Sequence, residues 1–333
     1  MCETKTAAGG RIRFPEYDIA KGIGVILVGI GHSPGLPFSV LLWIHSFHVP
    51  LYFFISGIFV KDEDDTPFLT SLKKNIKGLL LPYLVFSFVF LLMDILFPDI
   101  YTNPKLELKY ILMGQGSYGA LWFFFVLFFE RLILDVLRRF VKSKKLLTVL
   151  YVLMTAAGLF LHYQGLNEFK LASILYSSGF YYLGFLLKKS RFLLDVTKKE
   201  RWYLLPAFFG ANLLGILALY RLTGTTLDLN SATAFDIVLN YGTALSGIAV
   251  MLILSRLLTG NAVGTVFSYV GKNSLYFYPL LGGYIPFKIE SYTLSKTIPT
   301  QLLGWIIAAG ASVALSEIAR LFKKKRKQKA AAS

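Results

Sequence analysis

The sequence predicts an all-α polytopic membrane protein with about ten transmembrane helices and both termini in the cytoplasm. Of the 333 residues, 55% are hydrophobic and only 16% are charged, which is too little charge to cover the surface of a soluble protein of this length. The apolar residues form long continuous runs, and only helices and closed barrels satisfy their backbone in lipid. Because an alternating pattern is missing, helices explain these runs better than a barrel does.

Ten segments approach the roughly 20 mostly apolar residues that a membrane helix needs. The ninth is the least secure, because glycines, a lysine, an asparagine and a proline interrupt it, and it can be broken. The ten predicted spans are 16–33, 38–60, 76–98, 118–138, 145–163, 171–187, 202–221, 236–259, 262–286 and 299–322. Three regions follow: a cytoplasmic N-terminal segment at 1–15, a transmembrane domain at 16–322 and a polybasic cytoplasmic tail at 323–333.

The basic residues give the expected orientation. Most of the 35 Lys and Arg residues fall in every second loop and at the two chain ends, which is the pattern of cytoplasmic loops. The net charge of +16 therefore indicates a multi-pass protein of the cell membrane and no nucleic-acid partner. Cys2 is the only cysteine, which excludes an intramolecular disulfide and a thiolate metal site. The polar N-terminus resembles no cleavable signal peptide.

The first span carries a cation near its inner end and an imidazole at its outer end. His32 lies eleven positions after Lys21, which is about three helical turns and a rise of roughly 16 Å, so both side chains share one face. Asp18 lies one turn before Lys21 and is expected to pair with it. Charged residues inside membranes usually mark a pathway or a site. The alternative is a Lys21 that reaches back to the cytoplasmic interface and a hydrated His32.

The second span adds two more histidines at the same predicted depth. His45 and His48 are three residues apart on one helical face, and Pro50 is expected to reshape the helix after them. Three of the four histidines in the chain thus converge in the outer half of the membrane. Imidazole binds zinc well, but thiolates are missing here and carboxylates are few. We therefore expect no metal site.

Two phrases resemble the integral-membrane acyltransferase-3 family, especially its fucose 4-O-acetylase-like branch of sugar O-acetyltransferases. The family has a basic residue, ten intervening residues and then a histidine in its first helix, as Lys21 and His32 do, and its second helix carries a phrase like HSFHVPLYFFISG. Later phrases that resemble the family in order are KKNIKGLLLPY, GALWFFFVLF and GKNSLYFYPLL. One departure is Leu281, where the family often has a histidine. No role of that histidine carries over.

The resemblance implies transfer of an acyl group, usually acetyl from acetyl-CoA, to a hydroxyl of a glycan or a lipid-linked sugar. Acetyl-CoA would be a co-substrate arriving from the cytoplasm, with no permanently bound cofactor. The basic cytoplasmic face and Lys21 suit its phosphates, and a histidine suits removal of the hydroxyl proton at neutral pH. The predicted roles are a general base (His32) with supporting imidazoles (His45, His48), donor binding (Lys21, Asp18, Lys77) and a pocket lining (Trp122, Asn273, Ser274).

Several alternatives stay open at this stage. His32 either acts as a base or carries a covalent acyl group, and the donor is acetyl-CoA, succinyl-CoA or another acyl-CoA. The main rival function is a transporter or flippase for lipid-linked sugars. Four remaining polar groups receive structural interpretations: interhelical ion pairs for Glu130 and Arg131, an interfacial place for Asp94 and simple hydration for His162.

Overall fold

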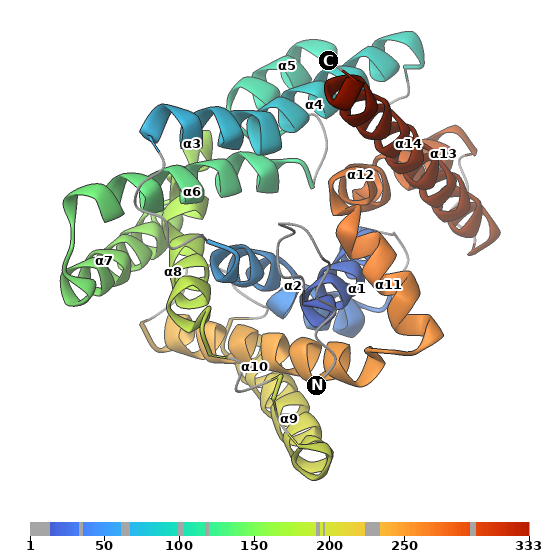
Figure 1. Ribbon diagram of the computed structural model, residues 1–333. Helices are drawn as coiled ribbons and strands as arrows, with labels where there is room; N and C mark the ends of the chain where they lie inside the picture. Colours follow the sequence, from blue (N-terminus) through green and yellow to red (C-terminus); the bar gives the residue numbers. More distant parts are fainter. Residues whose placement is uncertain are drawn as a thin grey trace.

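The computed structural model describes nine stretches of the chain, which are residues 14–32, 36–60, 67–98, 103–116, 120–190, 194–195, 197–223, 234–293 and 298–332. Within them the secondary structure is helical and no strand occurs, which confirms the all-α class. Figure 1 shows two helices near the middle of the molecule and the others arranged around them. The predicted N-terminal segment up to residue 13, with Cys2, lies outside the described residues.

The two central helices are α1 (Pro15–Gly31) and α2 (Phe38–Ile58). Pro15 opens α1 at the position where a missing N–H costs nothing, and acidic residues occupy its first turn, where the helix dipole favours them. Both helices pack against α10 (Ala234–Leu258), and α10 packs against the outlying α9 (Lys198–Thr223). The sequence predicted all four helices, and α2 continues through Pro50 without ending there.

A second group of helices flanks α2. It contains α6 (Trp122–Phe140), α7 (Lys144–Tyr163) and α8 (Leu171–Leu187), preceded by the short helix η2 (Glu168–Lys170). α8 packs against α2, α6 and α7 (Figure 1). Ser143 caps α7 by accepting a hydrogen bond from the Leu146 amide. The predicted span 171–187 has the bounds of α8.

The helical segment that contains the third predicted span begins before its apolar part. α3 (Phe68–Asn75), a π-helical turn η1 (Ile76–Leu80) and α4 (Leu81–Leu96) follow one another without a break. The prediction began at residue 76 because the preceding turn is rich in lysine. α5 (Pro104–Leu112) packs against α4 and was not predicted. It is short and carries charged residues, so no hydropathy signal marks it.

The ninth predicted span is broken, at the positions where its sequence is irregular. α11 (Ala262–Lys272) ends at Asn273, and α12 (Ser274–Pro279) leads into a π-helical turn η3 (Leu280–Tyr284) and α13 (Ile285–Thr293). The last helix, α14 (Ile298–Ala332), packs against α12, η3 and α13. α14 continues through the basic residues of the predicted tail, so that segment is helical.

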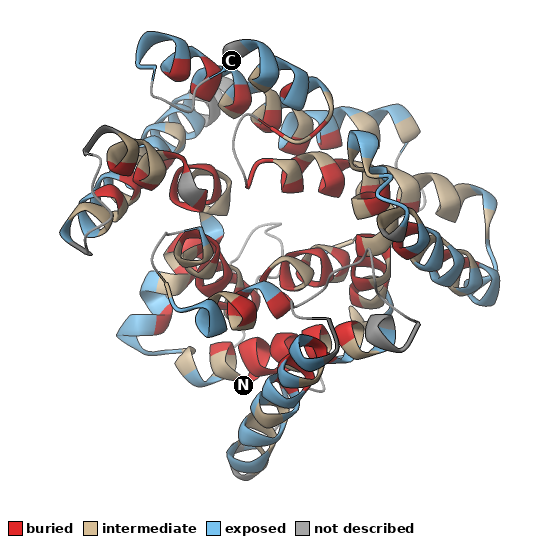
Figure 2. Cartoon of the chain, turned by 180° about the vertical axis from the view of Figure 1, so that it is seen from behind, coloured by how far each residue is buried: buried red, intermediate tan, exposed pale blue. Residues whose placement is uncertain are grey.

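Six helical segments of the described chain are long and apolar enough to cross a membrane. They are Phe38–Ile58, Phe68–Leu96, Lys144–His162, Glu200–Arg221, Val238–Leu258 and Pro299–Lys325. Figure 2 shows that buried residues face the middle of the molecule, whereas exposed residues lie on the outer helices. The outer helices expose many large apolar side chains, such as Leu214 and Ile306, each 68% exposed. Lipid would cover such a surface. The number of ten spans and the orientation of the termini stay predictions.

The contact between α1 and α11 depends on two glycines. A Cβ added at Gly22 would collide with the carbonyl oxygen of Phe267, and one added at Gly271 would collide with the carbonyl oxygen of Asp18. Small residues allow this close approach of helices in a membrane. The approach matters for the site, because Gly22 directly follows Lys21.

Replacing Gly22 by alanine is expected to destabilise the protein by about 1–3 kcal/mol, because a backbone carbonyl cannot move aside as a side chain can. The midpoint of thermal unfolding in detergent should fall. Gly310 lies on α14 with no atom within 4 Å of an added Cβ, so Gly310→Ala is the matched control and should leave the midpoint unchanged. Equal midpoints for the two variants would contradict the close packing of α1 on α11.

Candidate functional site

Three histidines lie together at one end of the two central helices. His32 caps the C-terminal end of α1, and its ring centroid lies 6.5 Å from that of His45 on α2. The ring of His48 follows one turn later, 5.1 Å from His45. His32 and His45 are exposed, whereas His48 is buried. The structure therefore brings together the three imidazoles that helical spacing predicted, with His45 in the middle.

Backbone carbonyls define the tautomers of these rings. Nδ1 of His32 lies 2.8 Å from the carbonyl oxygen of Val28, and Nδ1 of His48 lies 2.8 Å from that of Ile44. Because a carbonyl oxygen only accepts hydrogen bonds, each contact assigns the proton to Nδ1. Nε2 of His32 then carries a lone pair at an exposed position. Nε2 of a neutral imidazole held in this way can accept a proton.

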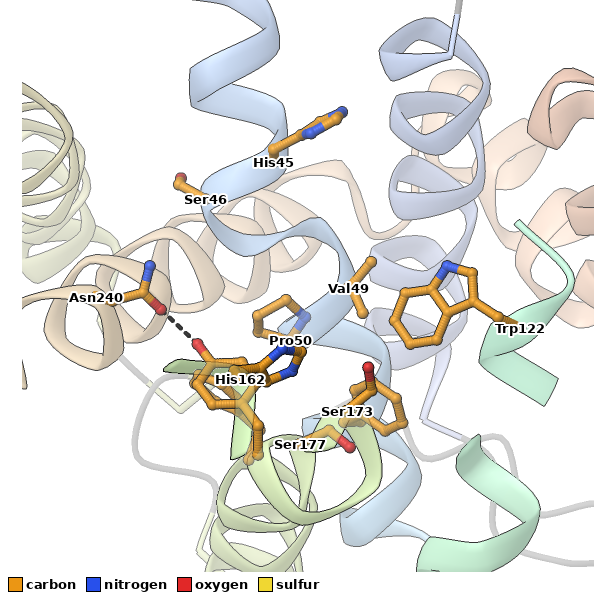
Figure 3. Close-up of a pocket in the computed structure, with 12 residues that line it drawn as sticks. His45, Ser46, Val49, Pro50, Trp122, His162, Ser173, Ser177 and Asn240 are labelled. Atoms are coloured by element: carbon orange, nitrogen blue, oxygen red, sulfur yellow. Dashed lines mark hydrogen bonds between the residues drawn. The ribbon is translucent and has the colours of Figure 1, made fainter. Parts of the chain in front are cut away.

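A cavity of about 250 Å³ opens beside His45, and we call it the histidine cavity. Figure 3 shows the lining residues His45, Ser46, Val49 and Pro50 along α2, and Trp122 at the start of α6. Its other lining residues come from α2, α7, α8 and α10 and are Phe53, His162, Ser173, Tyr176, Ser177, Phe180 and Asn240. Trp122, one of the residues expected to line a pocket, borders this cavity.

His162 has a different place from the one we predicted. It lines the histidine cavity, and its ring packs edge-on against Tyr176 at a centroid distance of 6.1 Å. Simple hydration at a helix end is therefore wrong for this residue. Sequence reasoning also missed Ser173, Ser177 and Asn240. The available signal was weak: polar residues in the predicted outer halves of two spans, with the two serines four residues apart on one face.

A second cavity of about 240 Å³ lies toward the opposite end of α1, and we call it the lysine cavity. Lys21 and Arg131 are its two basic lining residues. Nζ of Lys21 lies 2.8 Å from Oδ1 of Asp18, as predicted, and 5.4 Å from the ring centroid of Phe59. The remaining lining includes Ser56 on α2, Gly78 in η1 and Ser274 at the start of α12. The cavity is thus both basic and aromatic.

The interpretation of Glu130 and Arg131 as ion-paired residues is wrong within the described part of the chain. Glu130 is fully buried and accepts a hydrogen bond of 2.8 Å from the Ser177 hydroxyl, with no basic partner among the described residues. Arg131, the next residue, points to another helix face and lines the lysine cavity. Adjacent helical positions lie about 100° apart, so the two side chains serve different surroundings.

Aromatic rings lie between the two cavities. Phe53 lines the histidine cavity, Phe123 lines the lysine cavity, and their ring centroids are 5.0 Å apart. Tyr52 and Tyr278 pack against Phe123 from the lysine side at 5.4 and 5.3 Å. The Tyr52 hydroxyl donates a 2.7 Å hydrogen bond to the carbonyl oxygen of Lys21. These four rings separate a basic compartment from one that contains imidazoles.

Among the other predicted site residues, only Ser274 lines one of the two cavities. Asp18 is buried beneath Lys21 and does not line either cavity. Lys77 is exposed on η1 beside Gly78, where a π-helical turn often marks a functional position. Ser274 lines the lysine cavity, whereas the Asn273 side chain donates to the Tyr269 carbonyl and joins α11 to α12.

Asp94 is not interfacial, contrary to our prediction. It is 1% exposed, and its Oδ1 lies 2.7 Å from Nζ of Lys288 and accepts a 2.9 Å hydrogen bond from the Tyr284 hydroxyl. The carboxylate therefore connects α4 to η3 and α13. Across the part of the chain that the structure describes, no three His, Cys, Asp or Glu side chains are grouped so as to hold a metal ion.

The comparisons with known proteins agree with this arrangement. A family model described as an acyltransferase domain, Acyl_transf_3, matches residues 14–318. No curated protein and no solved structure matches the chain. The matched region contains both cavities and all three clustered histidines. Together with the six apolar helices, this match shows that the chain belongs to the acyltransferase-3 family of membrane acyltransferases.

Proposed function

We propose that the protein is an O-acyltransferase that moves an acetyl group from cytoplasmic acetyl-CoA to a hydroxyl of a surface glycan or lipid-linked sugar. The observation that carries this proposal is the pair of cavities on either side of the aromatic rings. The lysine cavity offers Lys21 and Arg131 to an anionic donor. The histidine cavity offers imidazoles to a hydroxyl. In the predicted orientation, the lysine cavity faces the cytoplasm.

The lysine cavity suits the donor because acetyl-CoA is polyanionic at one end and bears its thioester on a long flexible arm. Phosphates bind lysine and arginine through charge-assisted hydrogen bonds, with arginine adding a planar fork of donors. The exposed Lys77 on η1 extends the basic surface beside Gly78. The acyl end of the arm must then pass the rings of Tyr52, Phe53, Phe123 and Tyr278, which therefore have to move.

Transfer then needs a base on the far side of these rings. Nε2 of His32 accepts the proton of the acceptor hydroxyl while the oxygen of that hydroxyl attacks the thioester carbonyl. A C–O bond forms, the C–S bond breaks, and the sulfur leaves with the proton that His32 returns, so that an ester and free CoA thiol result. His45, held toward Gly31 with its Nε2 3.4 Å from the carbonyl oxygen, lies between His32 and the cavity. His48 is buried and positions the ring of His45.

The donor site is tested by acetyl transfer from labelled acetyl-CoA with purified protein and candidate glycans. Replacing Arg131 by methionine, or Lys21 by methionine together with Asp18→Asn, is expected to raise the KM for acetyl-CoA about tenfold, since a charge-assisted hydrogen bond contributes roughly 1.5–3 kcal/mol. The second substitution keeps Asp18 from being left as an unpaired buried carboxylate. The kcat at saturating donor should change by less than about threefold.

Lys145 is the control for overall basic charge, because it is exposed at the start of α7 and lines neither cavity. Lys145→Met should leave the KM for acetyl-CoA unchanged. An equal increase for all three proteins would mean that only diffuse surface charge attracts the donor. Sugar uptake into vesicles without acetyl incorporation would instead favour a transporter.

A further inference from the structure

The histidine cavity combines polar groups with aromatic rings and has no fully charged side chain. Its described lining residues include no Asp, Glu, Lys or Arg, but they include two histidines, three serines and an asparagine. Polar groups are costly in the interior of a membrane protein and usually mark a path or a binding site. A volume of about 250 Å³ is below the range typical of drug-sized ligands. The cavity therefore suits one small, neutral and polar molecule.

The Ser177 hydroxyl lines one wall of this cavity and is oriented by a buried carboxyl group. The hydroxyl donates to Oε1 of the buried Glu130 at 2.8 Å, so that hydrogen is directed away from the cavity. Toward the cavity the oxygen presents lone pairs, which accept a hydrogen bond from a ligand hydroxyl. Glu130 is thus a positioning residue for this wall, which gives the buried carboxyl a role that an ion pair does not supply.

Trp122 and its neighbours form the opposite wall. The Trp122 indole lines the cavity, as Figure 3 shows, and Nζ of Lys170 lies 5.5 Å from its ring centroid. A cation at this distance holds an indole ring in place. Burial lowers the pKa of Lys170 from its ordinary value, because desolvation disfavours the charged ammonium. An immobilised aromatic surface opposite hydrogen-bonding groups matches the shape of a sugar, whose ring has apolar C–H faces and a polar rim.

The remaining polar groups come from α7 and α10. His162 lines the cavity beside Tyr176, and the Tyr176 hydroxyl donates to Oδ1 of Asn240 (Figure 3). This bond fixes the direction of the Tyr176 hydroxyl hydrogen, so the Tyr176 oxygen can accept a hydrogen bond, while a histidine ring supplies a donor or an acceptor. These groups line the same cavity as Trp122 and His45.

We infer that the histidine cavity is an acceptor subsite that binds a single neutral pyranose ring against Trp122. The inference rests on the proposed function and adds the substrate class: neutral sugars bind, and uronic acids are rejected. A carboxylate would enter a polar membrane cavity whose described lining has no Lys or Arg, because Lys170 contacts the Trp122 ring without lining the cavity. A buried charge without a partner is strongly unfavourable. A neutral ring loses water but regains hydrogen bonds at its hydroxyls.

Direct binding is measured with the full-length protein in detergent, after Trp43, Trp202 and Trp305 are changed to phenylalanine so that Trp122 alone reports. The probes are the methyl glycosides of glucose, galactose, mannose and fucose, with methyl glucuronide as the charged counterpart of the glucoside. At least one neutral glycoside should change the Trp122 emission in a saturable way. The concentration that gives half of this change should be at least tenfold lower for the neutral glycoside than for methyl glucuronide. Saturation-transfer NMR on the wild-type protein gives the same comparison if the triple variant does not fold.

Asn240→Leu is expected to raise the half-saturation for the neutral glycoside about tenfold, because it removes the acceptor that orients the Tyr176 hydroxyl and so weakens a hydrogen bond at the cavity wall. Ser246→Ala is the matched control, because Ser246 lies on the same helix, does not line the cavity and donates to the Gly242 carbonyl. No response to any neutral glycoside, or equal binding of methyl glucuronide, would overturn the inference. An unchanged half-saturation in Asn240→Leu would also do so.

Acetyl transfer in the same preparation separates this inference from the proposed function. The KM for the acceptor should rise at least tenfold in Trp122→Ala, while the KM for acetyl-CoA stays constant, because the interaction lost is one of acceptor binding. Normal transfer with an unchanged acceptor KM would overturn the subsite and leave acyl transfer standing. Saturable sugar binding without any acetyl transfer would support the sugar site and count against the proposed O-acyltransferase.

Discussion

Replacing His32 by alanine is expected to lower the kcat of acetyl transfer by about 10²–10⁴-fold, which is the usual contribution of a general base. The reason is geometric: Nδ1 of His32 is directed at the Val28 carbonyl, so Nε2 of the exposed ring is the nitrogen to which the proposed mechanism assigns the proton. The KM for acetyl-CoA should not change, because the lysine cavity is lined by other residues. Rates are compared at equal levels of folded protein, judged by thermal unfolding.

Chemical rescue distinguishes a base from a structural residue at this position. His32 is exposed, so imidazole added to the His32→Ala protein should reach the vacated position and restore part of the rate. His48 is buried, and His48→Ala should not respond to imidazole even where its rate is low. Undiminished transfer by His32→Ala would remove the general-base mechanism. Equal rescue of both variants would mean that imidazole acts elsewhere.

A covalent route through His32 gives a different result in the same proteins. If an acyl-imidazole forms, the wild-type protein treated with labelled acetyl-CoA and no acceptor should retain label after denaturation, and His32→Ala should not. Direct transfer predicts no retained label in either protein. Both routes use the same residue, so they share the loss of activity and differ only in this intermediate.

Helical spacing within one span was enough to predict the core of the site. Lys21 with Asp18, and His45 with His48, are near neighbours on single helices, so a rise and a rotation per residue place them. In the predicted orientation, His32 lies at the same membrane depth as His45 and His48. These relations need no knowledge of which helices pack together, which is why the sequence alone revealed them.

The cavity walls could not be predicted in this way. His162, Ser177 and Asn240 lie on three different helices, α7, α8 and α10, and their convergence depends on which face each helix turns inward. Long apolar helices of a membrane protein give little periodic signal for this, because lipid and protein interior are both apolar. The predicted ion pairing of Glu130 and Arg131 was wrong for the same reason. The two residues are neighbours in the sequence, but their side chains face different surroundings.

The presence of a helix could be predicted where hydropathy is high. It was harder to predict where charged residues interrupt the apolar run. Span 171–187 coincides with α8, and glycine, asparagine and proline marked the break between α11 and α13. α5 contains three charged residues among nine, so it resembles a loop. It is helical because it packs on α4, and tertiary contacts override weak local preference.

Asp94 shows the largest difference between a local interpretation and the packed structure, and it carries the largest expected effect on stability. Asp94→Ala is expected to cost about 3–5 kcal/mol, because Lys288 would keep its charge at a side-chain exposure of only 12% without its carboxylate partner. The Tyr284 hydroxyl would also lose an acceptor. The measurement is unfolding of the purified protein in detergent, followed by temperature.

Two matched variants identify the cause of that loss. Asp94→Leu combined with Lys288→Met removes both charges and should recover most of the stability, because a hydrophobic pair avoids the desolvation of ions. Glu317→Ala removes the carboxylate from an exposed pair with Arg320 and should cost less than about 1 kcal/mol. The Tyr269 hydroxyl, which also donates to Glu317, keeps Ser316 as a partner. An Asp94→Ala protein as stable as Glu317→Ala would show that the buried pair does not hold α4 to η3 and α13.

The same pair connects stability to the site through η3. A Cβ added at Gly29, in the last turn of α1 before His32, would lie 2.8 Å from the carbonyl oxygen of Leu281 in η3, so η3 supports the end of α1 that carries His32. Loosening η3 in Asp94→Ala should therefore lower kcat even at temperatures where the protein stays folded, and the double variant should restore it. A folded Asp94→Ala protein with full kcat would mean that the position of His32 is set by α2 and α10 alone.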